Sequence, residues 1–85
     1  MVRVILPSVL AAQAGGKKHF DVDAETVGDA LRVLPIADLL LDEAGELRPL
    51  AWVYVDGTDA RKLGGLACPL EGARQIRIVG AVAGG

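Results

Sequence analysis

The two glycines that close the sequence, Gly84 and Gly85, are the residues best suited to covalent chemistry. An α-carboxylate on Gly85 is ionised at neutral pH and is a poor acyl donor, so its activation must come from another protein. ATP-dependent activation would give an acyl-adenylate, and a sulfur nucleophile would then displace AMP and leave a thiocarboxylate. Glycine at both positions removes the Cβ atoms that would crowd the reacting carbonyl. The terminus is therefore the first candidate site.

The residues just before this pair are all small. From Gly80 onward no side chain is larger than valine, and the segment includes Val82 and Ala83. This composition predicts a narrow, extended and flexible tail over residues 80–85. Such a tail can enter a slot that bulky residues cannot enter. Composition also leaves open a second interpretation, in which the segment is a frayed terminus without a function.

The other residues that could do chemistry stand alone. His19 is the one histidine, and it has no second His or Cys at metal-ligand spacing, so we expect no metal site. Cys68 is the one cysteine, and no neighbouring residue would activate its thiol, so we expect it to be inert and partly buried. The glycine pairs at 15–16 and 64–65 lack the setting of a phosphate-binding loop and predict turns. We expect neither a bound cofactor nor catalysis by the chain alone.

Size and composition set further bounds. The chain has 85 residues, of which 52% are hydrophobic, and a net charge of -2. The length and the hydrophobic fraction predict one globular domain. The slightly negative net charge favours neither nucleic acid nor an anionic membrane as a partner. No apolar run reaches the length of a membrane span, and the sequence opens without a signal peptide. We expect a cytoplasmic protein that is monomeric when alone.

The elements that must position the terminus begin with a predicted hairpin. Val2, Val4 and Leu6 alternate with Arg3 and Ile5 at the period of a strand, and Pro7 ends the pattern. Residues 19–23 alternate again, with Phe20 and Val22 on one face. The glycine pair at 15–16 supplies the backbone freedom for the reversal between these two strands.

A helix is predicted next, over residues 26–35. Thr26 is a good N-cap, Asp29 stands where a capping-box partner would, and Pro35 ends the pattern. Four apolar residues recur at helical spacing and form one stripe that would pack on a sheet. They are Val27, Ala30, Leu31 and Leu34. Residues 36–41 are compatible with a further helical turn.

Two more strands complete the predicted fold. Residues 51–55 alternate, with Ala51, Val53 and Val55 on one face, and Ile76 to Ile78 form the last strand. A hairpin, one main helix and further strands make a two-layer α+β domain in which the helix covers one face of the sheet. The other face of the sheet is expected to stay open.

Two aromatic residues and two arginines are candidates for partner binding. Trp52 and Tyr54 would lie on the open face, where exposed aromatic residues commonly anchor protein interfaces. Cross-strand packing under a loop or the tail is the alternative for this pair. For Arg61 and Arg77, ordinary solvated surface positions and the electrostatic attraction of a partner are both consistent with the sequence.

The sequence resembles the ubiquitin-like β-grasp sulfur carriers of the MoaD/ThiS family, and among them the CysO-like carriers. The closing Ala-Val-Ala-Gly-Gly is the most specific element of the resemblance. Further matching segments are residues 6–10, 14–18, 26–28, 53–57 with Asp59 and Arg61, 64–67 and 78–79. The resemblance implies a β-grasp fold, with a mixed sheet and one main helix on one face, over residues 1–79, followed by the tail at residues 80–85.

The chain departs from the family pattern at several places, among them the turn at residues 72–74, which is acidic in the family, and the stretch before Arg48, which is shorter than in many relatives. Asp56 stands where the family often has Asn, Gly80 replaces a proline, and Trp52 occupies a position usually held by a smaller residue. None of these differences touches the terminal glycines.

The resemblance also implies a function and partners. An E1-like enzyme would use ATP to adenylate Gly85 and would direct its conversion to a thiocarboxylate. The sulfur would then pass to a biosynthetic acceptor, such as a PLP-dependent cysteine synthase or a thiosugar-type synthase of secondary metabolism. Gly84 would belong with Gly85 to the reactive end. The residues expected to contact these enzymes are Trp52, Tyr54, Arg61 and Arg77, together with Val82 and Ala83 in the tail. The alternatives are the small subunit of molybdopterin synthase and a ubiquitin-like modifier that forms isopeptides.

Overall fold

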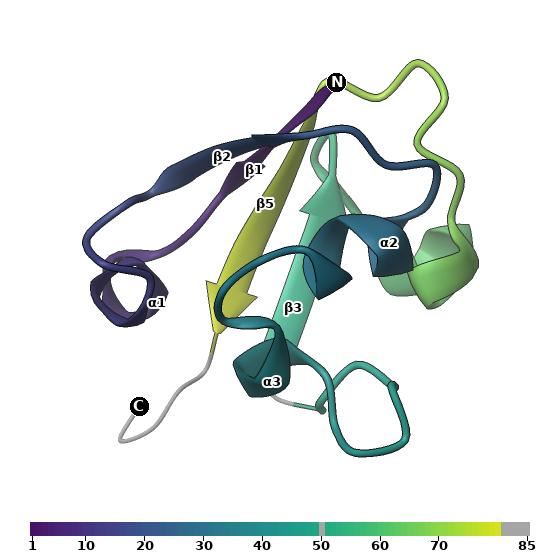
Figure 1. Cartoon of the computed structure of the whole chain (residues 1–85). Helices are drawn as coiled ribbons and strands as arrows, with labels where there is room; N and C mark the ends of the chain where they lie inside the picture. The colour runs from purple at the N-terminus through teal and green to yellow at the C-terminus, as the bar shows by residue number, and fades with distance from the viewer. Residues whose placement is uncertain (50, 81–85) are drawn as a thin grey trace.

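The protein, seen here as a computed structural model, is described over residues 1–49 and 51–80 (Figure 1). Its strands form one five-stranded sheet in the order β2-β1-β5-β3-β4. The strands are β1 (Val2–Ile5), β2 (His19–Val22), β3 (Ala51–Val55), β4 (Thr58–Asp59) and β5 (Gln75–Gly80). The helices are α1 (Ser8–Gln13), α2 (Val27–Arg32) and α3 (Ala37–Leu40), with the 3-10 helices η1 (Ala60–Leu63) and η2 (Gly65–Ala67).

The sheet is mixed, because β1 and β5 run parallel whereas every other neighbouring pair is antiparallel. Its core face carries the alternate residues of the three central strands, and Val4, Ile76 and Val53 are fully buried there. Helix α2 supplies the opposing layer, in which Val27, Ala30 and Leu31 are fully buried. The predicted two-layer α+β architecture with a mixed sheet is therefore confirmed.

Helix α2 begins where the sequence indicates. The Oγ1 atom of Thr26 accepts a hydrogen bond from the backbone N–H of Asp29 at 3.2 Å, as an N-cap does. The carboxylate of Asp29 does not reach back to the cap and instead accepts from the guanidinium of Arg32 at 2.9 Å. The helix ends at Arg32, whereas Leu34 of the predicted stripe lies beyond it and is still buried.

Replacing Thr26 by alanine should lower the free energy of unfolding by about 0.5–2 kcal/mol, because one N–H of the first turn loses its acceptor. Urea denaturation followed by far-ultraviolet circular dichroism measures this change. Thr26→Ser is the matched control, since serine keeps the capping hydroxyl and should stay close to the parent protein. Equal losses in both variants would contradict a capping role for the hydroxyl.

The opening of the chain differs from the predicted hairpin. Strands β1 and β2 are antiparallel neighbours, as expected, but helix α1 lies between them. The helix starts directly after Pro7, whose carbonyl accepts from the N–H of Ala11 at 2.8 Å. Leu10 and Ala11 face inward and are buried, so tertiary packing stabilises a helix too short to be stable alone. The periodic signal over six residues is too brief to predict it.

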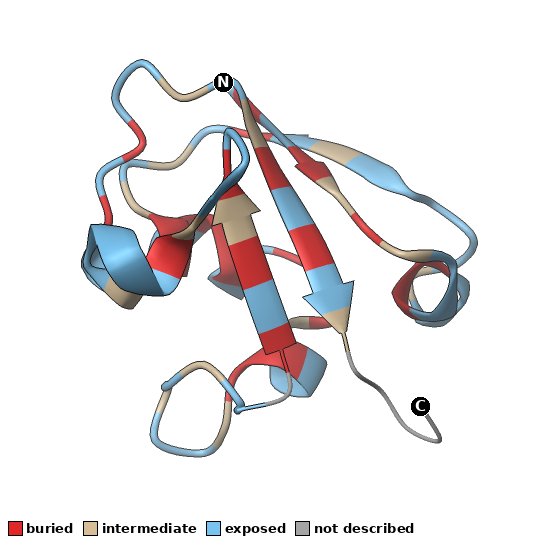
Figure 2. Cartoon of the chain, turned by 180° about the vertical axis from the view of Figure 1, so that it is seen from behind, coloured by how far each residue is buried: buried red, intermediate tan, exposed pale blue. Residues whose placement is uncertain are grey.

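The face of the sheet opposite α2 is open, as predicted. Figure 2 shows β3 and β5 from this side, with exposed and buried residues alternating along them and no helix in front. We call this surface the open face. Among residues 1–49 and 51–80, no helix has the length and apolar character needed to cross a membrane.

Candidate functional site

The described part of the chain ends in the middle of the sheet, at Gly80 of β5, and we call this point the exit. Strand β5 lies between β1 and β3, and its last residue, Gly80, pairs with Ala51 at the start of β3. Gly80, the first residue of the predicted tail, therefore still belongs to the sheet. The four tail residues predicted to react or to contact partners, Val82, Ala83, Gly84 and Gly85, lie outside the described residues.

An apolar pair stands next to this exit. Trp52 of β3 lies opposite Val79 of β5, one register position before the pair of Ala51 and Gly80. Both side chains point to the open face, where 39% of Trp52 and 43% of Val79 is exposed. Directly paired residues on one face of a sheet are in contact range, so the two side chains form a continuous exposed apolar patch.

A second row crosses the open face further from the exit. Tyr54 pairs with Arg77, Arg77 pairs with Ile5, and Ile5 pairs with His19, so the row spans four strands. Tyr54 and Ile5 are partly buried, whereas Arg77 and His19 are exposed. The row therefore places a cationic side chain between two apolar ones. We use the name docking face for Trp52, Val79, Tyr54, Arg77 and Ile5.

One ion pair borders the docking face. The Nε atom of Arg3 lies 3.1 Å from Oδ1 of Asp21 on the neighbouring strand, and both side chains are more than half exposed. Exposed pairs of this kind contribute about 0–1 kcal/mol, so this one is a minor source of stability. It partly neutralises the charge at this end of the sheet, whereas Arg77, the register partner of Tyr54, forms no ion pair with another described residue.

Arg61 lies beside the docking face, but its side chain is engaged within the protein. Its Nη2 donates to the backbone oxygens of Arg48 at 3.2 Å and Ala51 at 3.0 Å. Its guanidinium carbon also lies 5.2 Å from the centroid of the Trp52 ring. Arg61 therefore braces other parts of the protein, whereas the side chains of Trp52, Tyr54 and Arg77 point outward.

Sequence reasoning missed two members of the docking face. Val79 lies just beyond the predicted last strand, and the two-residue period puts it on the same face as Arg77, opposite to Ile76 and Ile78. Ile5 alternates in the same way with Val4. The strand period was therefore a usable signal for both. No sequence pattern indicates the hydrogen bonds of Arg61 to the two backbone carbonyls. The bonded residues are separated by 10 and by 13 positions along the chain, and a loop brings them together.

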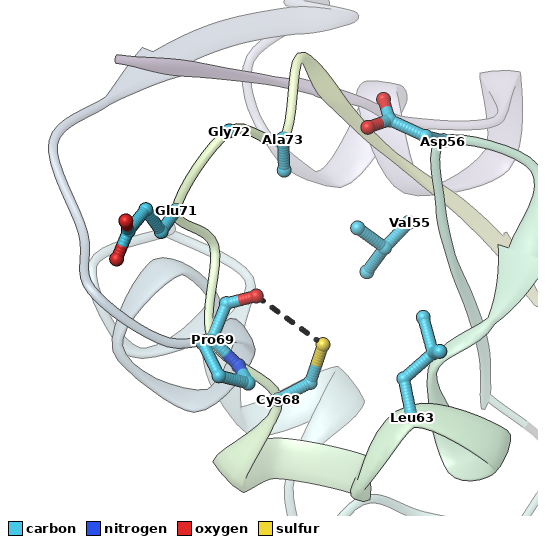
Figure 3. A pocket seen from close by; sticks show the side chains of 8 residues that line it. All are labelled: Val55, Asp56, Leu63, Cys68, Pro69, Glu71, Gly72 and Ala73. Carbon is cyan, nitrogen blue, oxygen red and sulfur yellow. Dashed lines mark hydrogen bonds between the residues drawn. The ribbon is translucent and has the colours of Figure 1, made fainter.

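The lone cysteine lines a shallow hollow on the other side of the molecule. The hollow, of about 380 Å³, is open to solvent and is bounded by Val55, Asp56, Leu63, Cys68, Pro69, Glu71, Gly72 and Ala73 (Figure 3). The thiol of Cys68 is buried and makes a weak hydrogen bond to the carbonyl oxygen of Pro69, with Sγ and O 3.5 Å apart. No side chain that could act as its base lines the hollow, apart from the two carboxylates.

One of these carboxylates, that of Asp56, is used to build a turn. Asp56 has a φ of 48°, in the left-handed region that few residues other than glycine and asparagine adopt. Its Oδ1 atom accepts from the backbone N–H groups of Arg74 at 3.2 Å and Gln75 at 3.1 Å. The side chain thereby ties the turn after β3 to the start of β5, the strand that leads to the exit.

Asp56→Ala should lower the free energy of unfolding by about 1–3 kcal/mol, because it removes the acceptor and places alanine at a positive φ. Asp56→Asn is the matched control, since asparagine tolerates this backbone conformation and keeps an acceptor oxygen. We expect the asparagine variant to lose less than half as much stability as the alanine variant in urea denaturation. A larger loss in Asp56→Asn would show that charge, not turn geometry, is what matters here.

No group of three His, Cys, Asp or Glu side chains that could hold a metal ion is present within the described part of the chain. The docking face itself is an exposed apolar and cationic surface beside Gly80, the last described residue of β5, and such a surface can support recognition of another protein.

Comparisons with known proteins identify the family. No family model matches the sequence. The sulfur carrier protein CysO of Mycobacterium bovis is 32% identical over 91 aligned positions, which cover 99% of this chain and 98% of that protein. The chain belongs to the CysO family of sulfur carrier proteins. The predicted sulfur carrier function is confirmed at this level.

Solved structures of CysO proteins share the fold of this CysO-family carrier. The crystal structure of CysO from Mycobacterium tuberculosis has a TM-score of 0.82 and 28% identity, covering 96% of this chain and all of that one. A crystal structure of a BexX/CysO complex from Amycolatopsis orientalis gives a TM-score of 0.80 and 30% identity, with complete coverage of both chains. The predicted ubiquitin-like β-grasp fold is thus confirmed as well.

Proposed function

We propose that this carrier holds sulfur as a thiocarboxylate on Gly85. In the loading step an E1-like enzyme uses ATP to form an acyl-adenylate on the Gly85 carboxylate and releases pyrophosphate. A sulfur donor then attacks the acyl carbon, AMP leaves, and a thiocarboxylate remains. The protein contributes a substrate group and a docking surface, and the partner enzymes contribute the catalysis.

The observation that carries this proposal is the position of the exit relative to the docking face. The Trp52 and Val79 pair directly precedes the last paired residue of β5, Gly80. A strand advances about 3.3 Å per residue, so a further five residues reach roughly 17 Å beyond the sheet edge when extended. An enzyme that binds the docking face would therefore have the Gly85 carboxylate within reach of a recessed active site.

The docking face has the composition of a protein interface. Aromatic residues and arginine are the residues that most often contribute strongly to binding at such surfaces, and Trp52, Tyr54 and Arg77 are of these types. The matching partner surface would be an apolar pocket for Trp52 and Val79 with a carboxylate opposite Arg77. Such a carboxylate would mainly raise the association rate and fix the orientation of the complex.

For the unloading step we propose a separate biosynthetic acceptor enzyme, of the cysteine synthase or thiosugar synthase type. The proposal is supported by the BexX/CysO complex, in which a CysO protein related to this one across its whole length is bound to another protein. The thiocarboxylate sulfur would bond to the electrophilic carbon of the acceptor substrate, either displacing a leaving group from that carbon or adding to its double bond with uptake of a proton. Hydrolysis of the resulting thioester would then release the sulfur on the product as a thiol and restore the Gly85 carboxylate.

Intact-mass spectrometry tests the loading step. The carrier is incubated with ATP, a CysO-type activating enzyme and sulfide, and we expect the mass to rise by the difference between one sulfur and one oxygen atom. Omission of ATP is the control and should leave the mass unchanged. A mass that stays constant with an activating enzyme that loads its own CysO would contradict the proposal. An isopeptide between Gly85 and lysines of other proteins, without a thiocarboxylate, would indicate a modifier.

A further inference from the structure

The outer edge of β3 is covered by a strand over only part of its length. The short strand β4 pairs with Tyr54 and Val55 alone, so it does not reach the first residues of β3. The carbonyl of Ala51 projects at this uncovered edge and accepts from Nη2 of Arg61 at 3.0 Å. The same Nη2 atom donates to the carbonyl of Arg48 at 3.2 Å, so one guanidinium replaces the missing strand neighbour.

Arg61 is held at both its ends. Its backbone N–H donates to Oδ1 of Asp59 at 2.9 Å, which caps helix η1 and fixes where the side chain starts. Its guanidinium lies 5.2 Å from the centre of the Trp52 ring, within the range of a cation–π interaction. Asp59 itself belongs to β4 and pairs with Tyr54. One side chain therefore contacts both the backbone of β3 and the ring of Trp52.

We propose that Arg61 is a positioning residue that fixes Trp52 in its docking orientation beside the exit of the chain. This inference rests on the proposed function, because it assigns Arg61 an effect on partner recognition through Trp52. Trp52 is 39% exposed, so packing restricts its side chain less than that of a core residue. The two carbonyl contacts fix the guanidinium, and the fixed guanidinium selects one position of the ring before a partner arrives, which lowers the entropic cost of binding.

Arginine is suited to this task and lysine is not. A planar guanidinium presents several N–H donors in a fixed fork and can stack on an aromatic ring while it donates to carbonyl oxygens. An ammonium group is a compact, strongly hydrated charge without this fixed geometry. The variant Arg61→Lys keeps the positive charge and loses the fixed geometry, so it distinguishes positioning of Trp52 from simple charge attraction.

Lys62, the next residue of η1, supplies the matched charge control. Its side chain is exposed and makes no hydrogen bond or ion pair within the described residues, so Lys62→Gln removes a charge without removing a contact.

Fluorescence gives a direct readout, because Trp52 is the only tryptophan in the chain. We expect Arg61→Gln and Arg61→Lys to raise the acrylamide quenching constant of Trp52 and to lower its fluorescence anisotropy. Lys62→Gln should leave both quantities unchanged. Far-ultraviolet circular dichroism of each variant shows whether the sheet is retained. These measurements need no partner enzyme, so they test the bracing of Trp52 even if the proposed loading reaction is not observed.

Loading kinetics test the link to function. With a CysO-type activating enzyme, we expect Arg61→Gln to raise the KM for the carrier about tenfold and to leave kcat within about twofold, as for a loss of binding without a change in chemistry. In a Trp52→Ala background, Arg61→Gln should change KM less than about twofold, since residues that act through each other are not additive.

Two results would overturn the inference. One is wild-type KM together with unchanged Trp52 fluorescence in Arg61→Lys, which would mean that only the charge matters. The other is a full tenfold rise in KM from Arg61→Gln in the Trp52→Ala background, which would mean that Arg61 contacts the partner independently. If the unmodified carrier is not loaded at all, the proposed function is contradicted instead. The fluorescence result would still show whether Arg61 braces Trp52.

Discussion

A carrier that lacks Gly85 should be loaded with sulfur more than about a hundredfold more slowly than the full chain. The carboxylate of the shortened chain ends one residue nearer the sheet, and a displacement of even about 1 Å from the reactive position can reduce a rate a hundredfold. Intact-mass spectrometry over time, with the activating enzyme, ATP and sulfide, measures the rate. Docking should be unaffected, because the described docking face ends at Val79.

Gly84→Ala is the companion variant for this experiment. It keeps the length of the chain and adds one methyl group next to the reacting residue, so it separates reach from crowding. We expect its loading rate to lie between those of the shortened chain and the parent protein. The urea unfolding midpoints of all three proteins should agree, since neither change alters a core residue in the described part of the chain. Loading of the shortened chain at the parent rate would rule out Gly85 as the site of activation.

Trp52→Ala should weaken binding of the activating enzyme about thirtyfold, which corresponds to a loss of about 2 kcal/mol at an interface hot spot. Isothermal titration calorimetry with the carrier and the enzyme measures the affinity. The fold should survive, because Trp52 lies on the open face and the core residues of β3 are Ala51, Val53 and Val55. An unchanged affinity in a folded Trp52→Ala variant would contradict a docking role for the open face.

Two exposed valines on different surfaces provide a matched comparison for this test. Val79 belongs to the docking face, whereas Val33 follows α2 on the helical side and is 63% exposed. Val79→Ser should weaken binding several-fold, and Val33→Ser should not change it, although both remove the same apolar group. Equal effects would indicate that the partner does not distinguish the two faces of the molecule.

Much of the fold is predictable because its signals are local. Thr26 marks the start of α2 through its side chain, and the alternation from Ala51 to Val55 indicates both the strand and its buried face. Helix α1 is the longest of the elements that the sequence patterns missed, the others being β4, η1 and η2. Its six residues bury only Leu10 and Ala11, so packing against the sheet decides its conformation, and packing partners distant in sequence leave no periodic trace.

The candidate site was predictable to a similar degree. The strand period alone places Trp52, Tyr54 and Arg77 together on the open face. The role of Arg61 could not be predicted in this way, because it depends on where a loop brings one guanidinium relative to the carbonyl of Ala51. Sequence analysis treats such an arginine as a surface charge, since the geometry of a side chain against a distant backbone has no pattern along the chain.

The central position of β5 has a consequence for the synthesis of the protein. The sheet joins its two halves only when this last strand inserts between β1 and β3, so contacts between the first and last segments of the chain complete the fold. Such long-range pairing is slow and comes late, because the loop entropy must be lost before the contacts form. The docking face, which needs residues of both β3 and β5, therefore exists only on a finished molecule. An activating enzyme that recognises this face would ignore nascent and misfolded chains, so ATP and sulfur would be committed only to carriers able to deliver them.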